Sequence, residues 1–522
     1  MRADAEPSRF DAFRITAAKG HAEPTSAQAA HIAELVARTV ARTPGSKALT
    51  QRHRAVLADP RVAAGFRSEW KEMVYPITCV RSKGARLWDV DGNEYIDLLN
   101  GFGQTAFGHA PEFVVEAVRA QLERGFAIGP MTELADEAAQ LFCELTGNER
   151  VTFCNTGSEA VMAALRVART VTGRNRVVVF GGAYHGQFDE VLVKGARNSP
   201  RALPVAPGIP PESVANMTVL PYGAPESLEW IREHARELAA VVVEPVQSRH
   251  PALAPKAFLG ELRAITAESG SALVFDEVVT GFRMHPAGMQ ALFGVRADLA
   301  TYGKVVGGGM PIGILAGTAT FMDALDGGMW EYGDESFPQV APTFFAGTFV
   351  RHPLTMAAVV AVLKHLRDQG PELQEALAER TAGLVGRLND ELARRGIGTR
   401  IESYGSLFYL NLASEDRLAG LLFYHLRNRG VYIQEGFPCF LTTEHGAAEV
   451  DAIVQAFSES LDELGSAGIL VEDKTSGSSG PASAGPGGNG GHAAPLLNKT
   501  ASAAPLLTEE QLEIWLAAQQ GD

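Results

Sequence analysis

A lysine and an aspartate occupy positions where a charged side chain needs a specific partner. Lys304, in TYGKVVGGGMPIG, lies between an apolar run and a glycine-rich turn. Desolvation at such a place lowers the pKa of an amine and makes it a usable nucleophile. Asp276 ends the apolar run ALVFDEV, and a buried carboxylate needs a cationic partner such as a protonated pyridine ring. Each residue alone has a plainer alternative, which is a surface lysine near a turn and an aspartate in a helix cap or local salt bridge.

The segment NTGSEA predicts an anion site. It places Thr156, Gly157 and Ser158 at a strand-to-helix turn, where small residues leave backbone N–H groups and hydroxyls facing one point. The positive end of the helix dipole lies at the same point, so the segment could hold a phosphate. The alternative is an ordinary helix start that is capped by Ser158.

Aromatic and polar residues follow two further apolar runs. Tyr184 and His185 follow NRVVVFGGA, and Glu244 and Gln247 follow LAAVVV. A tyrosine at a strand end can stack on a flat ring. Glu244 and Gln247 can hydrogen-bond a ring oxygen or position the surroundings of Asp276. Such residues are common at strand ends, so each carries weight only in combination with the others.

Strands that alternate with amphipathic helices position these residues. The alternation runs over about 75–472 and is typical of an α/β fold with a mainly parallel sheet. In such sheets ligands bind beyond the carboxyl ends of the strands, where every candidate above falls. The segment RLWDVDGNEYIDL predicts a hairpin that turns at Asp91-Gly92.

The two ends of the chain differ from this pattern. Residues 1–45 are expected to be a polar linker followed by a helix that stops at Gly45. Residues 473–505 are rich in Gly, Ser, Ala and Pro and predict a flexible linker. Residues 506–522 then return to a helical pattern, which we interpret as the truncated start of another domain. The apolar face expected for the N-terminal helix consists of Ile32, Leu35, Val36 and Val40.

Charge and cysteine usage restrict the class of protein. The net charge of −15 argues against a nucleic-acid-binding protein, because no basic face is available for the phosphate backbone. The four cysteines are far apart and form no metal-ligand pattern, so neither a zinc site nor a disulfide framework is expected. The sequence shows no signal peptide and no membrane span. A cytoplasmic protein is therefore expected.

The order NTGSEA, YHG, EPV, FDEVVTGFR and YGKVVGGGMPIG resembles the class III aminotransferases among the fold type I enzymes that use pyridoxal 5′-phosphate (PLP). The resemblance is closest to the glutamate-1-semialdehyde aminomutase branch and covers about residues 75–465. It implies an aminotransferase over 46–472. Its large domain, about 106–350, would hold a mainly parallel seven-stranded sheet, and a smaller α+β domain would come from about 46–105 and 351–472.

The resemblance also implies a role for each candidate residue. Lys304 would carry the cofactor as a Schiff base and move the proton, and Asp276 would pair with the pyridine nitrogen. Tyr184 would stack on the ring, and a second subunit of a homodimer would donate Thr348 to the phosphate. The cofactor-binding set is then Lys304, Asp276, Thr156, Gly157, Ser158, Tyr184, His185, Glu244, Gln247 and Thr348.

One segment departs from the family. Relatives usually carry Asn-Pro after the GT pair, whereas this chain has Arg351-His352-Pro353. Arg351 could contact an anionic substrate or a pantetheine arm, or it could form a salt bridge at the rim of the site. By analogy, residues 437–445 (FPCFLTTEH) are expected to line the substrate entrance.

The flanking sequences narrow the assignment. Residues 43–77 resemble the leader of aminotransferase domains in hybrid polyketide synthase/nonribosomal peptide synthetases, and residues 506–522 resemble the opening of a condensation domain. This resemblance implies a β-ketoacyl substrate on an acyl carrier protein, a neighbouring condensation domain, and glutamate or glutamine as amino donor. The alternatives are a 2,1-aminomutase that uses the same residues and a non-catalytic docking module. A PLP decarboxylase or racemase is remote.

Overall fold

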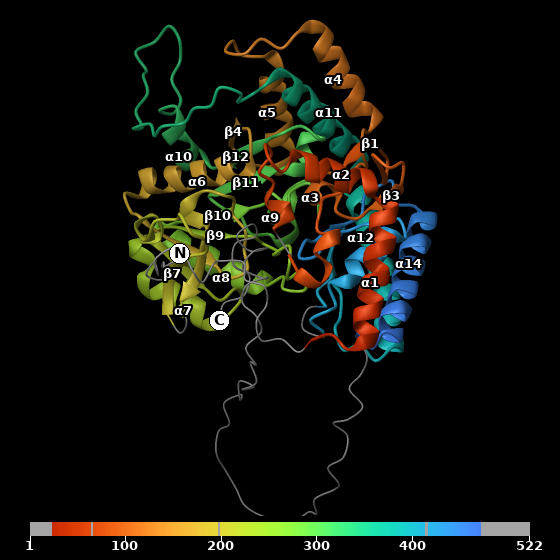
Figure 1. Cartoon of the computed structure of the whole chain (residues 1–522). Helices are drawn as coiled ribbons and strands as arrows, with labels where there is room; N and C mark the ends of the chain where they lie inside the picture. Colours follow the sequence, from red (N-terminus) through yellow and green to blue (C-terminus); the bar gives the residue numbers. More distant parts are fainter. Residues whose placement is uncertain (1–22, 64–65, 197–198, 413–415, 471–522) are drawn as a thin grey trace, which may run out of the picture.

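The computed structural model describes residues 23–63, 66–196, 199–412 and 416–470 (Figure 1). The segments expected to be a linker (473–505) and the start of another domain (506–522) lie outside the described residues. No helix in the described part of the chain is both long and apolar enough to cross a membrane.

A nine-stranded sheet forms the centre of the large domain. Its order is β4-β12-β11-β10-β9-β5-β8-β7-β6. The strands β11, β10, β9, β5 and β8 pair in parallel, and β12 runs antiparallel to β11 and β4. The expected mainly parallel sheet of seven strands corresponds to β4 through β8 in this order, and the antiparallel strands β7 and β6 extend it to nine. The bounds are β4 Arg150–Cys154, β5 Arg176–Phe180, β6 Val193–Ala196, β7 Ser199–Pro204, β8 Met217–Leu220, β9 Leu238–Val243, β10 Ala272–Asp276, β11 Leu299–Gly303 and β12 Gly313–Gly317.

Helices cover both faces of this sheet because its strands are apolar on both sides. Along β10, Leu273 and Phe275 belong to one hydrophobic cluster while Ala272 and Val274 belong to the other, as the two-residue period of a strand requires. The first cluster includes residues of α5, α8 and α11, and the second includes residues of α6. Relevant bounds are α4 Glu112–Arg124, α5 Glu133–Thr146, α6 Gly157–Thr172, α7 Pro225–His234, α8 Lys256–Ser269, α9 Gly288–Phe293 and α11 Pro353–Gln369.

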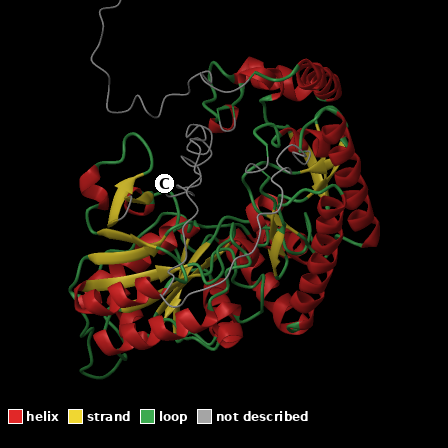
Figure 2. Ribbon diagram, turned by 90° about the horizontal axis from the view of Figure 1, so that it is seen from below, coloured by secondary structure: helices red, strands yellow, loops and turns green. Residues whose placement is uncertain are grey.

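The smaller domain combines two short sheets with long helices. Figure 2 shows the large sheet on one side of the molecule and the smaller strands on the other. The predicted hairpin is confirmed, since β2 and β3 pair antiparallel around Gly92, whose φ is 82°. The two sheets are β1-β2-β3-β15 and β13-β14-β16. Bounds are β1 Cys79–Lys83, β2 Arg86–Asp89, β3 Glu94–Asp97, β13 Glu402–Tyr404, β14 Leu407–Tyr409, β15 Val431–Tyr432, β16 Cys439–Phe440, α12 Glu372–Arg394, α13 Leu421–Asn428 and α14 Ala447–Ser466.

The N-terminal helix α1 (Ser26–Arg42) forms as predicted, but Gly45 is not its stop. Pro44 occupies the first position of a second helix, α2 (Pro44–His53), which contains Gly45. Proline suits this position because it needs no hydrogen-bond donor there and its φ is already helical. The backbone N–H groups of Gly45 and Ser46 donate to the Asp91 carboxylate at 2.6 and 3.1 Å, which fixes the start of α2.

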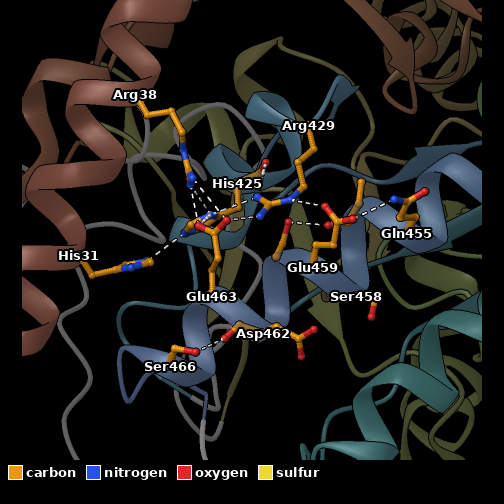
Figure 3. A network of polar contacts seen from close by, with 12 residues as sticks. His31, Arg38, His425, Arg429, Gln455, Ser458, Glu459, Asp462, Glu463 and Ser466 are labelled. Carbon is orange, nitrogen blue, oxygen red and sulfur yellow. Dashed lines mark hydrogen bonds and ion pairs between the residues drawn. The ribbon is translucent and has the colours of Figure 1, made fainter.

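Helix α1 packs on the small domain rather than standing apart from it. Ile32 and Leu35 join a hydrophobic cluster with residues of α12, α13 and α14. Figure 3 shows a polar network beside this cluster, in which Arg38 pairs with Glu463 at 2.7 Å. The expected boundary at residue 45 therefore does not separate α1 from the aminotransferase. At the far end of the helix, the side chain of Gln28 donates to the Gly468 carbonyl at 3.2 Å.

Candidate active site

The carboxyl ends of the central strands converge on one cavity of about 290 Å³. Because the strands that carry the candidates run in one direction, the loops after them lie at one edge of the sheet. The cavity is lined by Gln104, Asn155, Thr156, Gly157, Ser158, Val161, Tyr184, His185, Gly186, Glu244, Asp276, Val278, Val279, Lys304, Met310, Pro311 and Ile312. Eight of the ten residues predicted to bind the cofactor are in this set.

Asp276 is a buried carboxylate with a fixed orientation. It is 5% exposed at the end of β10. One oxygen lies 2.8 Å from His185 Nδ1, and the other accepts hydrogen bonds from the Val278 N–H and the Thr301 hydroxyl, both at 3.1 Å. Three neighbouring groups thus hold the carboxylate. A fixed carboxylate of this kind is suited to bind a cationic ring nitrogen in one orientation.

Two further titratable groups surround Asp276. Burial alone disfavours the charged form of His185, but the hydrogen bond and charge of Asp276 outweigh it and raise the pKa of the imidazole. Glu244 follows β9 and accepts a hydrogen bond from the Tyr184 N–H at 3.0 Å. Burial raises the pKa of Glu244 to about 7. A carboxyl group near this value can exchange a proton at neutral pH, a property that clusters at functional sites.

Lys304 follows β11 in an unusual backbone conformation. Its φ is +48°, in the left-handed region that side chains rarely adopt. The turn continues through Gly308 and Gly309, which also have positive φ. Burial lowers the pKa of the Lys304 amine, while the charges of Asp276 and Glu244 partly oppose this effect. The result is an amine that is more available as a nucleophile and base than an exposed lysine.

The predicted anion site is the start of helix α6. Thr156 is its N-cap and accepts from the Glu159 N–H at 3.2 Å. The alternative in which Ser158 caps the helix is wrong, because the Ser158 hydroxyl instead accepts from the Gln187 N–H at 3.2 Å. A Cβ on Gly313 would lie 1.9 Å from the Thr156 carbonyl oxygen, so only glycine lets β12 approach the helix start this closely. Gly157 and Ser158, in the first turn of α6, line the cavity, and backbone N–H groups at such a helix start can bind an anion.

Some predicted residues lie elsewhere. Gln247 is buried but does not line the cavity, and its side chain donates to the Gly181 carbonyl at 2.9 Å, which holds the turn after β5. Thr348 is exposed and does not line the cavity of its own chain. Arg351 has a φ of +58° and forms no ion pair with any residue the structure describes, so the salt-bridge alternative has no support within one chain.

Residues 437–445 were expected at the entrance, but none of them lines the cavity itself. Phe437 packs with Leu99 and Tyr432 instead. Its ring lies 5.0 Å from that of Phe102, in the segment that leads to Gln104 in the cavity wall. The segment therefore contacts residues that precede Gln104 and does not itself line the cavity.

Sequence reasoning missed three residues at the site. Thr301 hydrogen-bonds to Asp276 because the two residues are paired in the register of β10 and β11. The sequence feature that could have indicated this residue was a hydroxyl within the apolar strand LATYG. Gln104 lines the cavity between two glycines of GFGQTAFGHA. Arg283 is 1% exposed and donates to the carbonyls of Gly103 and Thr105 at 2.6 and 3.1 Å, so it holds both neighbours of Gln104. No local pattern indicates that role.

The donor set fits PLP. The cavity is of a size for a small flat ligand. Asp276 offers a buried carboxylate for a ring N–H, Lys304 offers an amine for the aldehyde, and the start of α6 offers N–H groups for a phosphate. Tyr184 lies in the same wall and can cover a ring face.

Comparison with known proteins agrees with this chemistry. The model of the family "Aminotransferase class-III" matches residues 67–457. The glutamate-1-semialdehyde 2,1-aminomutase of Aquifex aeolicus is 37% identical over 413 residues, which cover 74% of this chain and 93% of that protein. The omega-transaminase of Sphaerobacter thermophilus is similar in structure with a TM-score of 0.72 and 33% identity, over 81% of this chain and 99% of the other. The beta-phenylalanine aminotransferase of Variovorax paradoxus has a TM-score of 0.71 and 30% identity, over 84% and 98%.

These likenesses extend over both the strands and the loops that build the cavity, and the family model includes Lys304 and Asp276. The chain therefore belongs to the class III aminotransferases, which are enzymes that depend on pyridoxal phosphate.

Proposed function

We propose that this aminotransferase moves an amino group from an amino-acid donor to a β-ketoacyl thioester on an acyl carrier protein, which gives a β-aminoacyl thioester. The observation that carries the transamination is the meeting of Lys304, Asp276 and the start of α6 in one cavity. Two observations support the β-position and the carrier. One similar structure is a beta-phenylalanine aminotransferase, and residues 43–77 resemble the leader of aminotransferase domains in hybrid polyketide/peptide synthetases.

The residues of this chain have distinct tasks in such a reaction. PLP, when bound, supplies a carbonyl that condenses with amines and a ring that delocalises negative charge. Asp276 would pair with the protonated ring nitrogen, and the Thr301 hydroxyl and the Val278 N–H hold the carboxylate in place for this role. Lys304 would hold the cofactor through its amine, and the same amine would accept and return the proton at the reacting carbon of the substrate. The lowered pKa of Lys304 leaves more of the amine unprotonated for this step.

The site would be completed by a second copy of the chain. In this proposal the domain is a homodimer, and Thr348 from one protomer contacts the cofactor phosphate held by its partner. Thr348 is exposed and does not line the cavity of its own chain, which leaves it accessible to a partner. The same proposal includes a cytoplasmic location and a neighbouring condensation domain. This next domain would accept the product.

A second candidate is a 2,1-aminomutase, which moves an amino group within one substrate. The specific observation in its favour is the 37% identity to the aminomutase of Aquifex aeolicus. A non-catalytic docking module is disfavoured because Lys304 and Asp276 are both present and share the cavity.

The visible absorbance of the PLP-loaded protein separates these candidates. Single amino acids are added in turn, and we expect glutamate or glutamine to bleach the yellow band as the donor half-reaction proceeds. A carrier-bound β-ketoacyl chain should then restore the band, and mass spectrometry should find the β-aminoacyl thioester on the carrier. Lys304→Ala is the control and should complete no second turnover.

Two results would count against the proposal. If no amino acid bleaches the band but glutamate-1-semialdehyde is isomerised, the aminomutase is the correct assignment. If a donor bleaches the band and only small keto acids restore it, the transaminase is right and the carrier-bound substrate is wrong.

A further inference from the structure

One polar side chain in the wall of the cofactor cavity has no part in holding the cofactor. Binding of PLP accounts for Asp276, Lys304 and the start of α6. Gln104 lines the same cavity but comes from the side of the small domain, directly after the short helix α3 (Asn100–Gly103). Its side-chain NH2 group donates no hydrogen bond to any residue in the described part of the chain. A polar group of this kind in a binding cavity is available to a ligand.

The side-chain amide of Gln104 has a defined orientation. Its oxygen accepts a hydrogen bond from the Thr105 hydroxyl at 3.3 Å, and a Cβ on Gly101 would lie 3.1 Å from the same oxygen. The amide nitrogen has a different neighbour, because a Cβ on Gly309 would lie 3.7 Å from it. Gly309 belongs to the glycine-rich turn that starts at Lys304. The NH2 group therefore lies beside the turn that begins with the lysine.

The backbone that leads to Gln104 is strained, as is common at functional sites. Residues 100–103 have consecutive positive φ values of 47°, 60°, 59° and 86°. Phe102 is the outlier among them, since a bulky side chain rarely adopts this conformation. Gly103 has no room for a side chain, because its Cβ would lie 2.7 Å from the Phe440 ring. Other parts of the fold must therefore hold this segment in its conformation.

Arg283 holds the segment from the large domain. It is 1% exposed and donates to the carbonyl oxygens of Gly103 and Thr105, at 2.6 and 3.1 Å, on either side of Gln104. Its other terminal nitrogen donates to the Ser406 hydroxyl at 3.0 Å. These partners are uncharged, and burial without a carboxylate is costly for a cation. A side chain that contacts a substrate needs such a support, because a displacement of about 1 Å can cost much of the rate.

We propose that Gln104 is a specificity-determining residue, and that its NH2 group donates a hydrogen bond to the carbonyl oxygen of the acceptor thioester. This inference rests on the proposed function. A thioester carbonyl is neutral and only accepts hydrogen bonds, so it matches the N–H of a neutral amide. A guanidinium in the same position would favour a free acid, because it binds a carboxylate through two charge-assisted hydrogen bonds. Gln104 thus suits an acceptor whose carboxyl group is bound as a thioester.

Equilibrium binding to the protein loaded with pyridoxamine phosphate tests this contact. The probes are the β-hydroxybutyryl thioester of N-acetylcysteamine and free β-hydroxybutyrate, which have no keto group and cannot be aminated. In Gln104→Leu we expect the Kd of the thioester to rise about fivefold, because one hydrogen bond is lost. In Gln104→Arg the ratio of the Kd of the free acid to that of the thioester should fall by about tenfold. Gln455→Leu, at an exposed position on α14, is the matched control and should change neither value.

Two further measurements separate a contact with the substrate from a structural role. The Kd of PLP and the midpoint of thermal unfolding should be the same in Gln104→Leu as in the wild-type protein. In turnover of the β-ketobutyryl thioester, Gln104→Leu should raise KM more than it lowers kcat, because the hydrogen bond already forms when the substrate binds.

Failure of this inference is distinguishable from failure of the proposed function. If the wild-type protein does not bind the thioester probe, the contact is wrong. If the wild-type protein also leaves a carrier-bound β-ketoacyl chain unaminated, the proposed function is wrong as well. Equal binding of the probe by Gln104→Leu and the wild-type protein overturns the contact alone. A loss of PLP affinity in Gln104→Leu shows that Gln104 supports the cofactor or the fold, which also overturns the proposal.

Discussion

Acidification should loosen helix α1 from the small domain through His425. This side chain is fully buried, with Nε2 3.0 Å from His31 Nε2 and Nδ1 3.1 Å from the Arg38 guanidinium (Figure 3). Burial lowers the pKa of His425 from 6.5 to about 3, with Glu463 opposing and the charges of His31, Arg38 and Arg429 adding to the effect. Both His31 and Arg38 lie on α1, so release of this helix would expose the imidazole to water.

The direction of the pH effect follows from where the proton binds. With α1 docked, His425 takes up a proton only near pH 3, whereas an imidazole fully exposed to water takes one up near pH 6.5. Docking is therefore at full strength above pH 6.5 and weakens as the pH falls toward 3. For a fully exposed imidazole in the released state, the loss between pH 8 and pH 5 is at most about 2 kcal/mol, or about 30-fold in the opening equilibrium. Glu463 acts only below its ordinary pKa of 4.5, because its pKa is lowered in the docked state, so this range reports on the histidine.

Hydrogen exchange of the α1 amides measures this opening. Protection factors, corrected for the intrinsic pH dependence of exchange, should fall between pH 8 and pH 5 in the wild-type protein, by at most about 30-fold. His425→Gln should show a much smaller change. A residual slope is expected from His31, whose pKa is also lowered, mainly by burial. His53→Gln, at an exposed position, is the control. Equal slopes in the wild-type protein and His425→Gln would refute the reasoning.

Four substitutions test the active site. In Asp276→Asn, kcat should fall by a factor of about 10² to 10³, because a charge-stabilising contact is lost. The cofactor should remain bound, and single-turnover absorbance measures this outcome. Thr301→Val should cost about tenfold in the same assay, through one hydrogen bond to that carboxylate. Gly313→Ala should weaken PLP binding in a titration of the apo-protein, since its Cβ would meet the Thr156 carbonyl at 1.9 Å. Burial raises the pKa of Glu244 to about 7, so the pH–rate profile should contain a step near pH 7 that is absent in Glu244→Gln. If the step persists in this variant, it belongs to another group.

The meeting of Lys304 and Asp276 in one cavity was predictable because of a simple property of parallel sheets. Lys304 and Asp276 each end an apolar run, and parallel strands place all such ends at one edge. The residues that fix these groups were not predictable in the same way. Thr301 reaches Asp276 only through the register of β10 and β11, which no local sequence pattern shows. Arg283 binds carbonyls of residues 103 and 105 and also the carbonyl of Leu441, and such distant pairings follow only from the folded chain.

The helices and strands were predicted better than the contacts between them. Periodicity indicated α1, but its docking on α13 and α14 depends on residues 394 and 425 positions later in the chain. The expected stop at Gly45 failed because Pro44 begins a new helix as readily as it ends one. Tertiary contacts decide such cases, since short helices take most of their stability from packing.

The hydrogen bond between Gln28 and Gly468 joins the first and last parts of the folded unit. The start of α1 and the residues after α14 lie side by side on the small domain. A unit whose two ends meet can be spliced into a longer polypeptide as a self-contained cassette, since the parent chain needs only a small gap to accommodate it. For engineering, junctions before Thr25 and after Leu470 would keep α1, its hydrogen bond to Gly468 and the buried Ile469 and Leu470, whereas a junction at residue 45 would remove α1 from the small-domain core.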